Sequence, residues 1–223
     1  MHPLSDALEI AVVPVTAFQQ NCCLLRCRNT GRGALVDPGG EPERLLEAAE
    51  AGQVALEKIL LTHGHVDHAG ATAELAERLE LPVEGPHVEE RFWLERLEQQ
   101  AAMFGLGTSR NVEPDRWLTR GDRVAVGALE FEVEHCPGHT PGHVVFFHRP
   151  SRFALVGDVL FHGSIGRTDF PRGDYDTLIR SIRERLLPLG DDVRFLPGHG
   201  PMSTLGVERE SNPFLLDPEA YRP

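Results

Sequence analysis

The amino-acid sequence predicts an α+β fold, an αββα sandwich in which two mixed β-sheets pack face to face with helices outside. Three observations indicate this fold class. Strand-like segments fall into two groups, helical periodicity follows each group, and turns containing Gly and Pro separate neighbouring strands. The order of strands, two helical segments, strands, one helix and a last strand fits two packed sheets better than one doubly wound parallel sheet.

The first group of strands opens the chain. Apolar and alternating runs predict strands at residues 9–15, 22–28, 33–36 and 58–61. A helix before the last of these begins near Pro42, which is typical of a first helical turn, and ends at Gly52. Apolar spacing predicts two further helical segments, at residues 69–80 and 87–104.

The second group of strands begins after Gly121. Gly and Pro turns separate the strands predicted at residues 123–126, 130–135, 143–148 and 153–156. A helix at residues 175–187 follows, with Asp174 as its candidate N-cap, and residues 193–196 form a last strand. Because no linker, low-complexity segment or clear short repeat interrupts the pattern, we expect residues 1–223 to form a single domain.

The charge of the chain limits the classes of partner. The sequence contains 34 acidic and 22 basic side chains, which gives a formal net charge of -12. Proteins that coat nucleic acids or anionic membranes depend on Lys and Arg, so we expect neither partner. A small molecule is the expected partner, and the sequence carries no signal for an oligomeric state.

The N-terminus lacks the basic and apolar pattern of a secretory signal, and the longest apolar runs are far shorter than the roughly 18 residues of a membrane span. We therefore expect a soluble, cytoplasmic protein. Cysteines stay reduced in that compartment, and free cysteines are usually buried. We expect this state for Cys22, Cys23, Cys27 and Cys136.

A dense histidine motif follows the strand predicted at residues 58–61. It reads Thr62-His63-Gly64-His65-Val66-Asp67-His68-Ala69-Gly70 and combines three imidazoles with one carboxylate. Zn²⁺ and similar ions bind imidazole nitrogen and carboxylate oxygen, and their ligands must converge on one point. His63 and His65, two positions apart, can point to one side. Asp67 and His68 can point to another, which indicates two neighbouring metal ions.

Three later loops contribute further candidate ligands. They contain His139, Asp158 and His199, and each loop follows a predicted strand. Residues that follow strand ends gather at one rim of a sheet assembly, where rigid strands fix their geometry. Asp158 is a candidate bridge, because a carboxylate can give one oxygen to each of two ions.

Residues 62–68, together with His139, Asp158 and His199, resemble the full ligand pattern of the metallo-β-lactamase-fold hydrolases in spacing and order. The resemblance extends along nearly the whole chain, and it implies the αββα fold of that family and two metal sites. One site would consist of His63, His65 and His139 and the other of Asp67, His68 and His199, with Asp158 and a hydroxide between them.

Other segments of the sequence resemble one particular branch of this family. The chain is similar to the short glyoxalase II-like branch of this family, the hydroxyacylglutathione hydrolases of the YcbL type. The similar segments are residues 163–171 and 197–201 and the stretches around Phe92-Trp93-Leu94 and Asn212-Pro213-Phe214. This resemblance implies a thioesterase that cleaves an acyl-glutathione such as S-lactoylglutathione by attack of a metal-bound hydroxide. Such a reaction needs no serine nucleophile, and the chain has no Gly-x-Ser-x-Gly motif.

The resemblance also implies roles for single residues. Asp67 and Asp158 would be catalytic, and Asp67 could carry a proton as well as bind metal. The cofactors would be two divalent ions, with zinc expected and iron or manganese as alternatives. Arg167 and, after it, Arg172 are the candidates to contact an anionic substrate. Few residues follow His199, so we expect no separate C-terminal helical glutathione-binding domain.

Two other functions remain alternatives. Persulfide dioxygenases bind a single iron ion and share the histidine motif, but they usually carry His-Asp-Tyr where this chain has His199-Gly200-Pro201. A hydrolase of another small ester, thioester or lactone would use the same site. A non-catalytic metal-binding module is disfavoured, because a structural site does not need the bridge that Asp158 would provide.

One aspartate and three histidines outside the motif have separate expected roles. Asp37, in the turn after residues 33–36, either orients an imidazole or bonds its own backbone. His135 and His143 flank His139 and are expected either to end strands or to support the ligand beside them. His148 belongs to no motif and is expected to face solvent.

Overall fold

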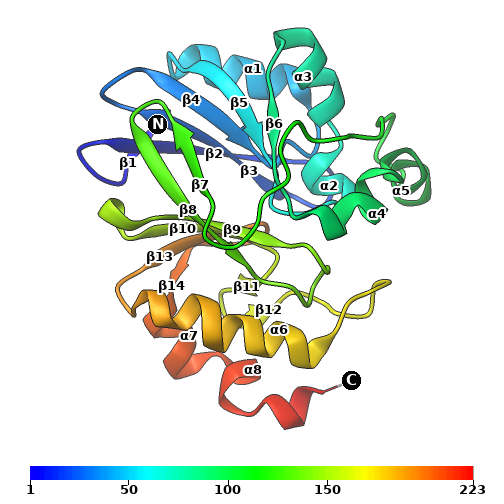
Figure 1. Cartoon of the computed structure of the whole chain (residues 1–223), viewed down its shortest axis with the longest axis vertical. Helices are drawn as coiled ribbons and strands as arrows, with labels where there is room; N and C mark the ends of the chain where they lie inside the picture. Colours follow the sequence, from blue (N-terminus) through cyan, green and yellow to red (C-terminus); the bar gives the residue numbers. More distant parts are fainter. Residues whose placement is uncertain (223) are drawn as a thin grey trace.

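The computed structural model describes residues 1–222 and contains two six-stranded mixed sheets packed face to face, with helices on both outer faces (Figure 1). The strand order is β1-β2-β3-β4-β5-β6 in the first sheet and β14-β13-β10-β9-β8-β7 in the second. A small antiparallel hairpin, β11-β12, stands apart from both sheets. The predicted αββα sandwich is confirmed.

The strands match the predicted ones closely, apart from several two-residue strands. The first sheet consists of His2–Pro3 (β1), Leu8–Val15 (β2), Gln20–Cys27 (β3), Arg32–Val36 (β4), Ala55–Leu60 (β5) and Val83–Glu84 (β6). The second consists of Arg123–Val126 (β7), Leu129–His135 (β8), Val144–His148 (β9), Phe153–Gly157 (β10), Arg194–Pro197 (β13) and Ser203–Thr204 (β14), and the hairpin of Leu160–Phe161 (β11) and Ser164–Ile165 (β12). Two-residue strands were not predicted, because they are too short to show a periodicity.

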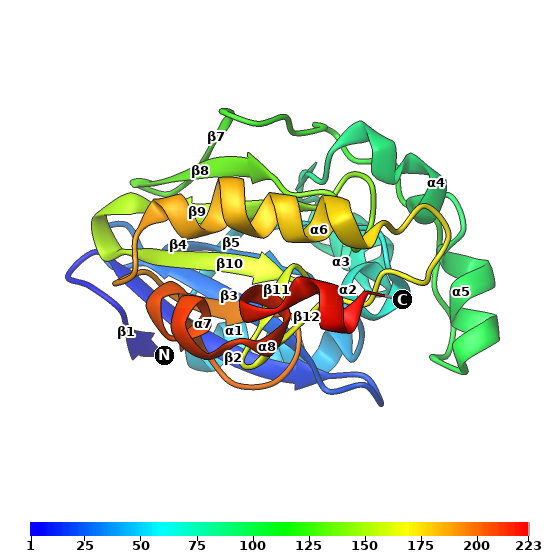
Figure 2. The same cartoon turned by 90° about the horizontal axis from the view of Figure 1, so that it is seen from below.

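Helices cover the outer faces of the two sheets. The first sheet is covered by Pro42–Ala51 (α1), Val66–Ala69 (α2), Thr72–Leu79 (α3), Arg91–Leu94 (α4) and Leu97–Phe104 (α5), and the second by Tyr175–Ser181 (α6), Leu205–Ser211 (α7) and Pro213–Leu216 (α8). Figure 2 shows α6 lying along the second sheet. Among residues 1–222, no helix is both long enough and apolar enough to cross a membrane.

The helical segment predicted at residues 87–104 is broken into three parts. A 3₁₀ turn at Val88–Glu90 precedes α4, and α5 starts only after Arg96, whose φ of -129° leaves the helical region. The helix predicted at residues 175–187 is α-helical only as far as Ser181 and continues as a π-helix. The break at Arg96 turns α5 away from α4, and both helices then line the cavity described below.

Strand β3 shows how the two sheets share one core. Cys23 and Leu25 face the second sheet, where they join a cluster with Phe131. Cys22 and Leu24 point to the opposite face and pack in the cluster under the helices of the first sheet. The strand is therefore buried on both faces, and its cysteines, like Cys27 and Cys136, are buried and free, as predicted.

Four strands end at the same rim of the sandwich. Strands β5, β8 and β10 end just before the loops that contain His63, His139 and Asp158, and β13 ends before His199. In the parallel pair β10 and β13, Gly157 lies opposite Pro197, so the loops that follow leave the sheet side by side. The predicted rim is therefore present.

Candidate metal centre

His63, His65 and His139 form a compact group at this rim. His63 Nε2 and His139 Nε2 lie 3.2 Å and 3.0 Å from His65 Nδ1, and all three side chains are buried. Burial, and after it the neighbouring imidazoles, lowers the pKa of His63 and His65. Both rings are therefore neutral, and their lone pairs are available to a cation.

Asp67, His68 and His199 form a second group beside the first. Asp67 Oδ2 lies 3.2 Å from His199 Nε2 and 3.8 Å from His68 Nε2. His68 is fully buried, whereas His199 is partly exposed. The side-chain donors of these three residues are also close enough to one another to hold one cation.

The Asp158 carboxylate lies between the two groups. Its Oδ1 is 3.3 Å from His68 Nε2, and its Oδ2 is 3.7 Å from both His139 Nε2 and His199 Nε2. Burial by itself would raise the pKa of this carboxyl, but the three imidazoles outweigh burial and hold its pKa well below the usual range. Asp158 is therefore ionised and contacts both groups, as a bridge requires.

The two groups fit a cation. The buried atoms His68 Nε2 and Asp158 Oδ1 have no hydrogen-bond partner among the described residues, although an unpartnered buried polar atom is unfavourable. Burial lowers the pKa of His68, but Asp158 and Asp67 outweigh it and raise that pKa, so the centre favours positive charge. Gly198 packs so tightly here that an added Cβ would collide with the Asp158 carboxylate and the His68 ring.

Neighbouring residues fix the orientation of these side chains. Asp37 accepts hydrogen bonds from the N–H and the hydroxyl of Thr62, at 2.7 Å and 2.6 Å, and lies 3.0 Å from His68 Nδ1. The structure therefore shows the first of the two roles expected for Asp37, in which its carboxylate orients an imidazole. His143 accepts a hydrogen bond from the Asp158 N–H at 3.0 Å and stacks on His63, which agrees with its expected supporting role.

Glu90 is a supporting residue that the sequence did not reveal. Its carboxylate is fully buried and accepts hydrogen bonds from the N–H of Gly64 at 2.8 Å and from the N–H of Gly142 at 2.7 Å. One glutamate therefore connects the loop of His63 and His65 with the loop that contains His139. The only local signal was an acidic residue beside Phe92 and Trp93 in an amphipathic stretch.

Gln100 supports the histidine motif from the opposite end of the broken helical segment. Its Oε1 accepts a hydrogen bond from the Val66 N–H at 3.1 Å, and its Nε2 donates to the carbonyls of Gly64 and Trp93 at 3.2 Å and 3.0 Å. Since Gln100 is buried, these bonds are shielded from water. The backbone of the motif is thus held on both sides of His65.

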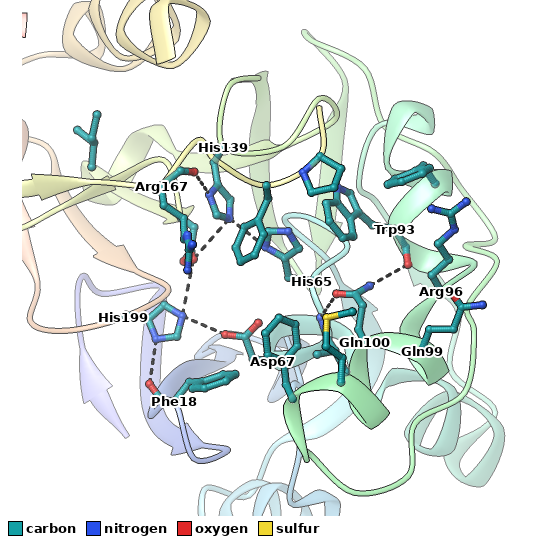
Figure 3. Close-up of a pocket in the computed structure, with 18 of the residues that line it drawn as sticks. Phe18, His65, Asp67, Trp93, Arg96, Gln99, Gln100, His139, Arg167 and His199 are labelled. Atoms are coloured by element: carbon teal, nitrogen blue, oxygen red, sulfur yellow. Dashed lines mark hydrogen bonds and ion pairs between the residues drawn. The ribbon is translucent and has the colours of Figure 1, made fainter. Parts of the chain in front are cut away.

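A cavity of about 830 Å³ opens beside the two groups (Figure 3). Asp158 and members of both groups contribute polar side chains to it. Its remaining wall is mostly apolar and includes Phe18, Phe92, Trp93, Met103, Phe104, Phe161, Ile165, Phe170 and Pro171. A substrate group of mainly apolar character fits such a wall, with its reacting atoms beside the carboxylates and imidazoles.

Arg167, the predicted substrate contact, lines this cavity. Its guanidinium makes two hydrogen bonds to the Asp169 carboxylate, both at 2.6 Å, and lies over the Phe170 ring at 4.2 Å. Its carbonyl oxygen accepts a hydrogen bond from His139 Nδ1 at 2.7 Å. Arg167 therefore contacts the predicted centre through its backbone, while its charge is already paired.

The prediction for His148 was wrong. Instead of facing solvent, His148 is buried, and its Nδ1 lies 2.6 Å from the hydroxyl oxygen of Ser151. A 3₁₀ turn at Arg149–Ser151 folds back over the end of β9 and brings Ser151 onto the ring. His148 is not among the residues that line the cavity.

Comparison with known proteins identifies relatives over almost the whole length of the chain. The model of the Metallo-beta-lactamase superfamily matches residues 15–199. Hydroxyacylglutathione hydrolase GloC of Haemophilus influenzae is 47% identical, over 93% of this chain and 98% of that protein. Among solved structures, TTHA1623 in a di-iron-bound form is 40% identical with a TM-score of 0.84, over 92% of this chain and 100% of that one. The BLEG-1 B3 metallo-beta-lactamase is 35% identical with a TM-score of 0.85, over 93% and 99%.

Proposed function

The chain belongs to the metallo-beta-lactamase superfamily, and from this premise we propose that it is a metallo-hydrolase that cleaves acyl-glutathione thioesters such as S-lactoylglutathione. The observation that carries the proposal is Asp158, whose oxygens lie within 3.7 Å of both His139 and His199 on the floor of an apolar cavity. The name of the relative GloC, hydroxyacylglutathione hydrolase, supports the choice of a glutathione thioester.

The proposal assigns the two groups to two metal ions. His63, His65 and His139 would hold one ion and Asp67, His68 and His199 the other, with Asp158 shared between them. When bound, such ions lower the pKa of water and polarise a carbonyl oxygen. Zinc, iron and manganese all suit these donors, and the di-iron form of the relative TTHA1623 supports iron as well as zinc.

In this proposal the chain's own residues position the thioester and handle the proton. The aromatic wall packs against the thioester and keeps bulk water, other than the attacking molecule, away from the reacting bond. Asp67 lines the cavity; its Oδ2 faces His199 and would bind the second ion, so the other oxygen of its carboxylate can take up the proton of the attacking water. The leaving thiolate needs little protonation, so one carboxylate suffices for this role. We also propose that residues 1–223 act as one domain, in which the cavity wall contacts the thiol part of the substrate.

The persulfide dioxygenase alternative is less well supported. A mononuclear centre would use one group of donors and leave the other carboxylates buried beside it without an ion. The second group of Asp67, His68 and His199, together with Asp158, instead supports a two-metal hydrolase. Another small ester, thioester or lactone would be a different substrate for the same two groups of donors, and its hydrolysis is the second candidate function.

The function is tested on purified protein loaded with zinc, iron or manganese. We expect two metal ions per chain by elemental analysis and release of free thiol from S-lactoylglutathione. Oxygen uptake with glutathione persulfide is measured in parallel, and we expect it to stay at background. Thioester cleavage that remains at background while both sites hold metal would contradict the proposal, and oxygen uptake would favour the dioxygenase.

Removal of the metals is expected to lower the melting temperature of the protein. Ions that bind only the folded chain stabilise it by about 4 kcal/mol for each site at a thousandfold excess over its Kd. A chain of this size changes its melting temperature by about 2–4 °C per kcal/mol, so chelation should lower it by roughly 15–30 °C. Thermal unfolding with and without a chelator measures this shift. An unchanged melting temperature after complete metal loss would contradict a stabilising role of the centre.

A further inference from the structure

Two arginines from separate segments meet on one aromatic ring at the cavity. The guanidinium carbon of Arg96 lies 4.0 Å from the centre of the Phe92 ring, and that of Arg172 lies 4.3 Å from it. Arg96 stands in the break between α4 and α5, and Arg172 lies in the loop before α6. Both Phe92 and Arg96 line the cavity.

Neither guanidinium has an acidic partner within the described residues. Most arginines of this chain pair with a carboxylate: Arg91, on the same short helix as Phe92, lies 2.8 Å from Glu113, and Arg167 pairs with Asp169. Arg96 and Arg172 make no ion pair and no side-chain hydrogen bond in residues 1–222. Two cations therefore share one ring without a carboxylate beside them, in a chain with a net charge of -12.

Stacking leaves the donors of these side chains available. A guanidinium held by its face on an aromatic ring keeps the N–H groups at its edge free for another acceptor. Those edges form planar forks that match a carboxylate or a phosphate group. Phe92 therefore holds two anion-binding groups in place without neutralising either of them.

An aromatic path connects the two arginines with the candidate metal centre. The ring centres of His65 and Trp93 are 4.7 Å apart, and those of Trp93 and Phe92 are 5.2 Å apart. Both guanidiniums stack on the Phe92 ring. In Figure 3, Arg96 is on the opposite side of the cavity from Asp67 and His199. The thiol of a glutathione-like tripeptide lies on its middle residue, and the longer arm extends from there by about two residues, roughly 7 Å, so with the sulfur at the centre the charged end can approach the guanidiniums on Phe92.

We propose that Arg96 and Arg172 together bind the anionic end of the thiol part of the substrate, with Phe92 as their common support. The inference rests on the proposed thioesterase function and adds to it the residues that recognise the carrier. Carboxylates of a glutathione-like peptide and phosphates of a larger carrier share this chemistry. With Arg167 paired to Asp169, these two side chains supply the unpaired positive charge beside the cavity.

The kinetic test compares three thioesters of the same acyl group on the metal-loaded protein. S-lactoylglutathione carries carboxylates, lactoyl-coenzyme A carries phosphates, and S-lactoyl-N-acetylcysteamine carries no charge. We expect Arg96→Ala and Arg172→Ala each to raise KM for S-lactoylglutathione about fivefold, and the double variant by more, as is typical of partly exposed charge pairs. KM for the neutral thioester should stay unchanged, as should kcat for both.

Two variants separate charge from packing. Arg96→Lys keeps the charge but loses the planar fork and the stacking on Phe92, so it should restore only part of the affinity for S-lactoylglutathione that Arg96→Ala loses. Arg91→Ala removes an arginine from the same helix that is paired with Glu113 and should leave every KM unchanged. A KM that rises equally for charged and neutral thioesters in the double variant would overturn the proposal, because it would indicate a structural effect. A larger effect on lactoyl-coenzyme A than on S-lactoylglutathione would identify phosphate as the recognised anion.

A binding measurement keeps this inference separate from the proposed function. S-methylglutathione has the carboxylates of glutathione but no thioester and no free thiol, and calorimetry measures its affinity without turnover. We expect the double variant to bind it at least tenfold more weakly than the wild type, with a weaker dependence on salt. Equal affinities would refute the anion site even if thioesters are cleaved. Arginine-dependent binding without thioester cleavage would keep the anion site and refute the thioesterase.

Discussion

Replacing Asp158 by asparagine is expected to abolish thioester hydrolysis and to remove metal at the same time. The Asp158 carboxylate contacts His68, His139 and His199, and an asparagine amide offers one neutral oxygen in its place. Loss of a residue that merely supports a metal ligand reduces activity or metal affinity by about 10- to 100-fold. A shared ligand should exceed this, so we expect kcat/KM to fall at least a hundredfold. Elemental analysis and thioester kinetics on one preparation measure both effects.

His148→Ala is the control for this variant. His148 is a buried histidine that contacts Ser151 and does not line the cavity. Its removal should lower the melting temperature by a few degrees but leave metal content and kcat/KM unchanged. Full activity of the Asp158→Asn variant with only one metal ion bound would contradict the bridging role of Asp158.

The strands and the rim of the site could be predicted because they follow from short stretches of sequence. Alternation along residues 123–126 and 130–135 reflects which face of a strand is buried, and the observed strands Arg123–Val126 and Leu129–His135 differ from the prediction by one residue at most. The candidate ligands come just after such strands, so their gathering at one rim follows from the same reasoning. The structure brings all seven predicted ligands together.

The residues that sequence reasoning missed act through contacts between distant parts of the chain. Glu90 bonds the backbone of Gly64 and Gly142, so no side-chain pattern marks its partners. The stacking of Arg172 on Phe92 depends on a loop and a helix break that no periodicity reveals. For the same reason the sequence could not show that Arg167 pairs with Asp169 rather than standing free.

Among the single substitutions considered, Glu90→Ala is expected to have the largest effect on stability. It leaves the N–H groups of Gly64 and Gly142 buried without an acceptor, and each such group is unfavourable by about 1–3 kcal/mol. We therefore expect a loss of roughly 4 kcal/mol, or about 8–16 °C in melting temperature. Metal affinity should fall as well, because both loops carry candidate ligands. Glu90→Gln keeps the shape and one acceptor, so its loss should be intermediate.

The dependence of this effect on pH distinguishes a charged from a neutral Glu90. Burial raises the pKa of Glu90 to about 7, against the opposing effect of the Thr140 hydroxyl and the two backbone N–H groups. Between pH 4.5 and 7 the folded chain then holds a proton that the unfolded chain has lost, so the contribution of Glu90 to stability falls as pH rises through this window. From pH 4.5 to pH 7, the free energy of unfolding of the wild type should fall by roughly 3 kcal/mol relative to that of Glu90→Gln. The comparison uses metal-free protein, because a nearby dication would itself favour the charged carboxylate. If the difference in unfolding free energy between the wild type and Glu90→Gln stayed constant with pH, Glu90 would be ionised throughout. Its two N–H bonds would then outweigh burial.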